Sequence, residues 1–484
     1  MSRTPDILVI VSDDQGTWAM AHAGTFELDT PNLDRLAEMG KRFDALYCVS
    51  PVCSPARASI LTGRIPSAHG VHDWLAAGNS TLERAYHRLL IDYLDGFETY
   101  PEILAHAGYR CGLSGKWHLG KTEEPHRGFD FWQAFPTGGG SYRDPKIVDG
   151  RRMTDREGYL TEIITDNALE FLRAQDGARP WYLSVHYTAP HSPWALDEHE
   201  PEDVAAFWPE CDFPSLPRDP MHPDIYDPAA YPETPERRRE ILSGYAAAIR
   251  GMDRQIGRLL DHLEAEGRLE DTFILFTSDN GMNMGHHGIY GKGNGTDPIN
   301  LFETSVRVPG IAAWPGRIAP GRLTGIYSHY DILPTLLGLA NLPDRVPEGL
   351  PGRDLSEVLL AEAPEEDGFA VVFDEYGPHR MIRQGRWKYI HRADPEACEL
   401  YDLETDPGET RNLAALPEQA ATRARLTRDL EDWFARYRDP ARDGFDRPVR
   451  GGGQIDHCTA PRTDLPPYRL HDGRPACPPF RGST

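Results

Sequence analysis

The sequence predicts an α/β fold: a large, mostly parallel sheet flanked by helices on both faces, plus a smaller C-terminal α+β subdomain with a short antiparallel sheet and a helix. Short, mainly apolar runs at residues 7–12, 181–187 and 272–277 alternate with amphipathic stretches. This alternation is typical of buried parallel strands that are connected by helices. Polar side chains follow the ends of these runs, where open α/β sheets bind their ligands.

The length and charge of the chain limit its class. A chain of 484 residues with a hydrophobic fraction of 39% can bury a sizeable core and form two parts. We expect a larger domain at residues 1–355, a C-terminal subdomain at 356–450 and a tail at 451–484. The net charge of −24 excludes nonspecific binding of nucleic acid and disfavours long, densely sulfated polymers, although a local cationic pocket can override this field.

Cysteine usage and the N-terminal sequence bear on the cellular compartment. The seven cysteines form no Cys-x-x-Cys pair and are odd in number, which favours reduced thiols over a disulfide framework. A pairing of Cys458 with Cys477 stays open. No apolar run has the length of a membrane span, and no signal-peptide pattern precedes residue 7. We therefore expect a cytoplasmic protein without a membrane partner.

The first elements carry the first candidate ligands. The strand at residues 7–12 ends in Asp13 and Asp14, which either lie at a ligand site or cap the next segment. A helix is expected from Pro31, with Thr30 as its N-cap. The histidine-rich loop after residue 68 either binds the substrate or packs as an ordinary loop. Its candidate side chains are His72, Asp73 and Trp74.

Residues 48–64 combine a thiol, a cation and a helix start. Pro55 suits the first turn of a helix, so Cys53 is expected at a helix N-terminus, where N–H groups and the helix dipole favour an anion. Arg57 lies one turn later and projects back toward the same point. The alternative is a buried cysteine beside a turn, with Arg57 in a surface ion pair.

The next predicted strand, residues 109–114, leads to Lys116 and His118. If this segment is extended, both side chains share one face and converge on one site. The alternative is a strand end with a solvated lysine and a hydrogen-bonded histidine. Residues 136–160, which include three glycines at 138–140, are expected to form a mobile insert near the pocket mouth. This insert contributes Tyr142 and Arg143.

The second half of the larger domain repeats the pattern. A helix at 162–174 precedes the strand at 181–187, and His191 follows between two prolines on a stiff loop, beside Trp194. After an irregular stretch, a long helix at 241–266 precedes the strand at 272–277. That strand ends at Asp279 and Asn280, and Lys292 follows. In the C-terminal subdomain we expect three short strand segments between residues 370 and 403 and a helix at 417–437.

Several segments resemble the sulfatase family, in the same order. The segment Cys53-Ser-Pro-Ala-Arg57 resembles the Cys/Ser-x-Pro-x-Arg signature, and Leu61-Thr-Gly-Arg64 continues it. Further resemblances are Gly115-Lys-Trp-His-Leu-Gly120, Pro190-His-Ser-Pro-Trp194, Ser278-Asp-Asn-Gly281, Gly285-His-His-Gly-Ile-Tyr-Gly-Lys292, Arg307-Val-Pro309 and Leu400-Tyr-Asp-Leu403.

The resemblance implies a chemistry for these positions. It implies that a formylglycine-generating enzyme oxidises Cys53 to formylglycine, whose hydrate attacks sulfur. Asp13, Asp14, Asp279 and Asn280 are hard oxygen ligands that select calcium or magnesium over zinc. The resemblance implies calcium, completed by residue 53, with Mg²⁺ or Mn²⁺ as alternatives.

The remaining site residues also take their roles from the resemblance. Arg57 would anchor residue 53, and Lys116 and Lys292 would neutralise the sulfuryl oxygens. His191, with Lys292, would protonate the leaving oxygen, and His118 would deprotonate the second hydroxyl.

The expected function is hydrolysis of a sulfate monoester of a small carbohydrate. The candidate sugar-binding side chains are His72, Asp73, Trp74, Tyr142, Arg143 and Trp194. Two alternatives stay open: a phosphonate or phosphate ester hydrolase of the same superfamily, and a noncatalytic binder of sulfated glycans if Cys53 stays unmodified. The sequence does not predict the oligomeric state.

Overall fold

The computed structural model describes residues 4–83, 87–361, 363–365, 368–374, 379–392, 394–449 and 451–469. It contains one large mixed sheet of 11 strands, in the order β11-β2-β12-β8-β1-β7-β3-β4-β5-β6, with β13 paired to β2. The central strands β8, β1, β7, β3 and β4 run parallel, and antiparallel pairs occur toward both margins. The strands are β1 Asp6–Ser12, β2 Gly40–Tyr47, β3 Arg110–Lys116, β4 Phe131–Phe135, β5 Lys146–Asp149, β6 Arg152–Asp155, β7 Trp181–His186, β8 Thr272–Ser278, β11 Arg307–Val308, β12 Gly310–Ala313 and β13 Gly321–Ser328.

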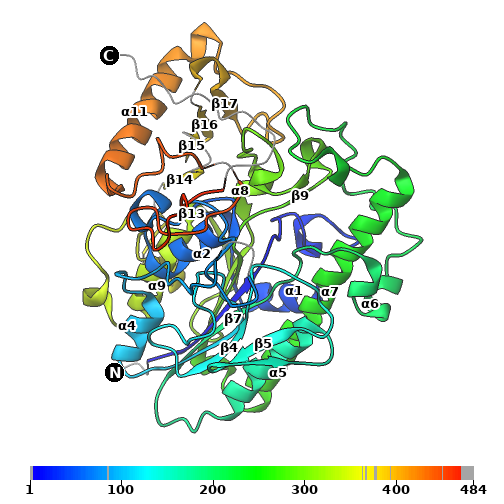
Figure 1. Cartoon of the computed structure of the whole chain (residues 1–484), viewed down its shortest axis with the longest axis vertical. Helices are drawn as coiled ribbons and strands as arrows, with labels where there is room; N and C mark the ends of the chain where they lie inside the picture. Colours follow the sequence, from blue (N-terminus) through cyan, green and yellow to red (C-terminus); the bar gives the residue numbers. More distant parts are fainter. Residues whose placement is uncertain are drawn as a thin grey trace.

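Helices cover both faces of this sheet (Figure 1). Alternate residues of β1 enter different cores: Ile7 and Val9 pack with one set of helices, and Leu8 and Ile10 pack with the other. The first set is α2 Cys53–Thr62, α4 Tyr100–His106 and α9 Ile332–Leu339; the second is α1 Pro31–Glu38, α5 Leu160–Arg173 and α7 Pro235–Ala265. Burial on both faces explains why residues 7–11 of β1 are all apolar.

The C-terminal subdomain forms its own antiparallel sheet in the order β14-β15-β16-β17. These strands are β14 Phe369–Asp374, β15 His379–Gln384, β16 Trp387–His391 and β17 Glu399–Asp402, and helix α11 Ala420–Tyr437 packs on them. The predicted fold class is therefore confirmed. In the part of the chain that the structure describes, no helix is long and apolar enough to span a membrane.

Helix α1 is capped differently from the prediction. Thr30 stands at the N-cap position, but its hydroxyl accepts a hydrogen bond from the Ala21 amide at 3.0 Å. The carboxylate of Asp253, on α7, instead accepts from the amides of Asn32 at 3.1 Å and Leu33 at 2.8 Å. A long-range contact thus satisfies the first N–H groups of α1.

Residues 136–160 are not a mobile insert. Strands β5 and β6 lie in this stretch, and β5 pairs with β4, so the segment extends the main sheet. The expectation of a loose insert was wrong because short strands with glycine turns look like loop in the sequence.

Residues 451–469 do not form a free tail. This segment, here named the C-terminal strap, packs on the loop at residues 70–79. Gln454 is completely buried: its side chain accepts from the His72 amide at 2.8 Å and donates to the Gly70 carbonyl at 3.1 Å. The pairing of Cys458 with Cys477, which the sequence left open, stays open because Cys477 lies outside the described residues.

Candidate active site

The acidic residues meet where β1 and β8 end. The two strands pair in parallel with Ser12 opposite Ser278, so the residues that follow them lie side by side. The Asp14 amide donates to Asp279 Oδ1 at 3.2 Å, and Asn280 Nδ2 donates to Asp14 Oδ1 at 2.8 Å. One carboxylate oxygen from each of Asp13, Asp14 and Asp279 lies within 4.8 Å of the others. The structure thus brings together the acids predicted from two distant strands.

This cluster fits a hard divalent cation. Asp13 Oδ1 and Asn280 Oδ1 are buried and have no hydrogen-bond partner among the described residues. Burial raises the pKa of Asp13, and the neighbouring Asp279 raises it further, against the opposing effect of Lys116. A cation held by carboxylate and amide oxygens would coordinate Asp13 Oδ1 and Asn280 Oδ1, which lack hydrogen-bond partners among the described residues, and would reduce the repulsion between the neighbouring carboxylates. The donor set suits calcium or magnesium better than zinc.

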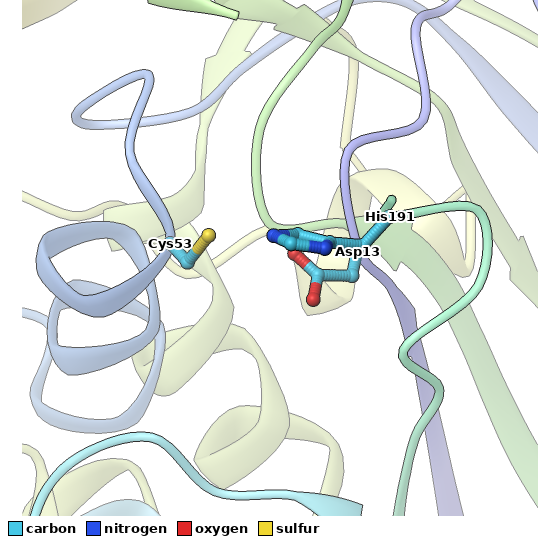
Figure 2. Close-up of side chains that lie close together, drawn as sticks. All are labelled: Asp13, Cys53 and His191. Atoms are coloured by element: carbon cyan, nitrogen blue, oxygen red, sulfur yellow. The ribbon is translucent and has the colours of Figure 1, made fainter. Parts of the chain in front are cut away.

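Cys53 begins helix α2 beside this cluster, with Pro55 in the first turn, as predicted. Its sulfur points from the helix toward Asp13 and His191 (Figure 2), and the three side chains offer atoms within 4.8 Å of one another. Burial raises the pKa of the Cys53 thiol to about 12, although Lys116 and Lys292 act in the opposite direction. An unmodified Cys53 is therefore a protonated thiol, which is a poor nucleophile at neutral pH.

Arg57 is buried, not part of a surface ion pair. Its Nε donates to Asp279 Oδ2 at 2.9 Å and its Nη1 donates to the Lys116 carbonyl at 3.2 Å. Burial alone would raise the pKa of Asp279, but Arg57 and Lys116 together hold it well below its usual range. Arg57 therefore links helix α2 to the ends of β8 and β3.

Two lysines complete the centre. Lys116, at the end of β3, is completely buried and forms an ion pair with Asp13. Lys292 Nζ lies 2.6 Å from Asp14 Oδ1 and 2.7 Å from Cys53 Sγ. Burial would lower the pKa of Lys292, but the carboxylate of Asp14 raises it well above its usual range, so the ammonium is retained. Lys116 is therefore not the solvated side chain of the alternative interpretation.

Both predicted histidines lie in the same region. His191 Nδ1 donates to the Ser192 carbonyl at 2.7 Å, which leaves Nε2 facing Asp14 Oδ2 at 3.7 Å. His118 Nε2 donates to the Leu75 carbonyl at 3.1 Å, and its buried Nδ1 has no partner in the described structure. Burial, reinforced by Lys116, holds the pKa of His118 well below its usual value, so its imidazole is neutral.

The predicted extended geometry of residues 116–118 was wrong. Strand β3 ends at Lys116, and His118 has a φ of 54°, in the left-handed region. The chain turns here, so the two side chains reach the site by a bend and not by sharing one strand face.

Three of the six predicted sugar-binding side chains are buried and form hydrogen bonds within the protein. His72 Nδ1 pairs with the Tyr468 hydroxyl at 2.6 Å, and Asp73 Oδ2 accepts from the Gly453 amide at 2.9 Å. The Tyr142 hydroxyl donates to the His191 carbonyl at 2.7 Å. Because these polar atoms hold the protein together, the prediction that these three residues bind substrate directly is corrected.

The other three predicted sugar-binding residues are partly exposed. Arg143 forms an ion pair with Glu200, so its charge is already compensated. The indole N–H groups of Trp74 and Trp194 donate to the carbonyls of Gly451 and Pro190, at 3.0 and 2.8 Å. Only the ring faces of these tryptophans remain candidates for stacking on a sugar.

His186 is a neighbour of the site that the sequence reasoning missed. It ends β7, is 2% exposed, and its Nδ1 lies 3.1 Å from the Lys116 carbonyl and 3.4 Å from Arg57 Nη1. Burial, with Arg57 nearby, lowers the pKa of His186 to about 3. A polar residue at the end of an apolar strand was the available signal.

Comparisons with known proteins agree with this arrangement. The family model described as Sulfatase matches residues 5–342, and that of the N-sulphoglucosamine sulphohydrolase C-terminal region matches residues 285–436. The chain is 29% identical to an N-acetylglucosamine-6-O-sulfatase of Bacteroides thetaiotaomicron, over 90% of this chain and 88% of the relative. It is 32% identical to a choline-sulfatase of Rhizobium meliloti, over 92% and 89%.

Solved structures show the same fold. A protein in complex with its substrate D-glucosamine-2-N,6-O-disulfate superposes with a TM-score of 0.74 at 26% identity, covering 91% of this chain and 99% of that one. A phosphonate monoester hydrolase of Agrobacterium radiobacter shares the fold, with a TM-score of 0.66, 23% identity and coverage of 90% and 96%. The matched models, the curated relatives and the assembled acids, lysines and cysteine together show that this chain belongs to the sulfatase family, whose members are hydrolases of sulfate esters.

Proposed function

We propose that this sulfatase hydrolyses the sulfate monoester of a small carbohydrate, with Cys53 converted to formylglycine and with a calcium ion. The observation that carries the proposal is the position of residue 53, buried at a helix N-terminus within reach of Lys292 and Asp13. A formylglycine-generating enzyme is then the partner that matures the chain.

The cluster of Asp13, Asp14, Asp279 and Asn280 would hold the ion. When bound, calcium supplies a Lewis acid that polarises sulfate oxygens and orients residue 53. The hydrated aldehyde supplies two hydroxyls on one carbon, one to attack sulfur and one to let sulfate leave by elimination. In sum, the ester and one water give sulfate and the free alcohol.

The chain's own cations bind the charged group. Lys292 contacts residue 53 and Lys116 pairs with the neighbouring Asp13, so both side chains would neutralise the sulfuryl oxygens. Arg57 fixes Asp279 and the end of β3, which holds the site in one geometry.

The two histidines move protons. His191 Nε2 faces the centre and delivers a proton to the leaving alcohol oxygen, which is a poor leaving group when unprotonated. His118 Nδ1 is neutral and has no partner among the described residues, so it would accept a proton from residue 53.

The names of the relatives support a carbohydrate sulfate. The B. thetaiotaomicron relative is named for a 6-O-sulfated amino sugar, and the solved complex holds a sulfated glucosamine. Trp194 lies beside the His191 loop with part of its ring exposed, and such rings stack on sugars.

The test combines peptide mass spectrometry with substrate assays. The peptide containing residue 53 should carry an aldehyde in place of the thiol. The protein should release sulfate from N-acetylglucosamine 6-sulfate faster than from choline sulfate, and faster than it cleaves a phenyl phosphonate ester. Cys53→Ala and Cys53→Ser should abolish turnover, while the folded state is retained by circular dichroism. Wild-type rates in Cys53→Ser would refute the mechanism.

Removal of the metal tests the ion. Dialysis against a chelator should abolish sulfate release, and added calcium should restore it. Unchanged rates in metal-free protein would contradict the assignment of the acid cluster, and a phosphonate rate above the sulfate rate would make this a phosphonate hydrolase.

A further inference from the structure

Two glycines pack directly against the imidazole rings of the site. A Cβ atom at Gly138 would lie 2.9 Å from His118 Nδ1 and closer still to Nε2 and Cε1. A Cβ atom at Gly139 would lie 2.8 Å from His191 Cε1 and 3.2 Å from its Nδ1. A Cβ atom closer than 3.0 Å to a ring atom requires something to move, so a side chain at either position would displace the imidazole or the loop.

The conformation of these glycines does not explain their presence. Neither Gly138 nor Gly139 has a positive φ, so an alanine could adopt the same backbone. These positions have no side chain because the backbone leaves no room for one beside the two imidazole rings.

The same loop also holds the backbone of His191. The buried Tyr142 hydroxyl donates to the His191 carbonyl at 2.7 Å, and the Tyr142 amide donates to Glu198 at 2.8 Å. The Thr137 hydroxyl donates to the Gly139 carbonyl at 3.0 Å. Gly139 and Tyr142 of this loop thus face the ring and the main chain of His191, respectively.

We infer that Gly138 and Gly139 are positioning residues, which fix the rings of His118 and His191 for proton transfer. The inference rests on the proposed sulfatase mechanism, which makes these histidines the proton donor and acceptor. Gly139 fixes the direction in which His191 Nε2 faces, since Nδ1 is already bound to the Ser192 carbonyl. A ring displaced by about 1 Å loses the alignment that proton transfer requires.

The kinetic test uses leaving groups that differ in their need for a proton. A sugar alkoxide must be protonated as it leaves, whereas 4-nitrophenolate leaves without a proton. Gly139→Ala should therefore lower kcat/KM for N-acetylglucosamine 6-sulfate by about 10- to 100-fold, and for 4-nitrophenyl sulfate by less than about 3-fold. Gly138→Ala should lower kcat for both substrates, because His118 acts after the leaving group has departed.

Gly140→Ala is the matched control. Gly140 is exposed, and a Cβ atom there would meet only the tip of the Phe135 ring, at 3.3 Å. This variant should leave both rates within about 2-fold of wild type. Equal losses in Gly139→Ala and Gly140→Ala would overturn the inference, as would an equal loss on both substrates in Gly139→Ala.

A double variant separates ring contact from general damage. In the His191→Ala background no ring remains for a Cβ atom at residue 139 to strike, so adding Gly139→Ala should cost less than about 2-fold. Additive losses would mean that Gly139 acts through something other than His191, which contradicts the inference.

A structural readout keeps this inference distinct from the proposed function. In protein labelled with ¹³C-histidine, Gly139→Ala should shift the ring resonance of His191, assigned with His191→Ala, and Gly140→Ala should not. Unmoved histidine resonances overturn the inference whatever the kinetics. Moved resonances in a protein that cleaves no sulfate ester support the positioning while refuting the proposed function.

Discussion

Arg57 is one of the largest side chains in the molecule to be completely buried, and its contacts tie three elements of the site together. A guanidinium has planar, fixed donors, and it can bind a carboxylate and a carbonyl at the same time. A lysine ammonium in the same space cannot reproduce both directions. The specific side chain therefore matters as much as its charge.

Arg57→Lys should lower kcat by at least about 100-fold, because Asp279 and the end of β3 lose their common anchor. The free energy of unfolding should fall as well. Steady-state assays and thermal melts give both quantities. Arg322→Lys, at the exposed pair with Asp44, is the control and should change neither. Full activity in Arg57→Lys would show that charge alone suffices.

At the scale of the elements, the strands and long helices could be predicted from local pattern, because the spacing of apolar residues along each segment shows which faces are buried. The strand at residues 7–12 is apolar on both faces, and the acids that follow it lie at the predicted edge. The bend that carries His118 could not be predicted, because a histidine does not by itself signal a φ of 54°. For the loop containing His72 the sequence left substrate binding and loop packing open, because its partner Gln454 is distant in sequence.

Asp253 shows how one element depends on another, and it predicts a pH effect on stability. Burial raises the pKa of Asp253 to about 6, although the N–H groups of α1 act to lower it. The folded state therefore holds this proton more firmly than the unfolded state, whose pKa is near 3.8. The resulting stabilisation is complete below pH 3.8 and is lost as the pH rises through about 6.

Asp253→Asn removes this titration. The Tm of the variant relative to wild type should therefore rise between pH 4 and pH 7, by an amount corresponding to about 3 kcal/mol. Comparing the two proteins at each pH cancels the other titrating groups. A constant difference in Tm across this range would show that Asp253 has an ordinary pKa.

The C-terminal strap is the element that sequence pattern predicted least well. Gln454→Leu would leave the His72 amide and the Gly70 carbonyl without partners in a buried setting. The expected loss in free energy of unfolding is about 1–3 kcal/mol. Because the loop carries Leu75, whose carbonyl binds His118, kcat should fall too. Unchanged melting and turnover would mean that the strap is dispensable.

At the scale of the whole molecule, a buried ion cluster joins the subdomain to the larger domain. Lys388, on β16, is completely buried and lies 2.6 Å from Glu409 and 3.2 Å from Glu303. Glu303 also accepts from the Tyr47 hydroxyl at 2.8 Å, at the end of β2. Removing one member of such a cluster leaves the charges of the others buried and uncompensated, where the dielectric constant is low.

Lys388→Met should therefore lower the free energy of unfolding by about 3–5 kcal/mol, as measured by thermal or urea melts. Glu409→Gln in the same chain should restore part of the loss, because one uncompensated carboxylate disappears. Lys146→Met, at the exposed pair with Asp155, is the matched control and should cost less than about 1 kcal/mol. Equal losses in both lysine variants would argue against a special role for the buried cluster.

The place of β1 in the sheet has a consequence for biosynthesis. Its neighbours β7 and β8 begin at Trp181 and Thr272, so the first strand made waits for partners that leave the ribosome much later. At about 5–20 residues per second, that delay is roughly 8 to 50 s. During this time the apolar residues 7–11 of β1 lack their strand partners on the nascent chain. Overproduction should therefore depend on chaperones and lower temperature.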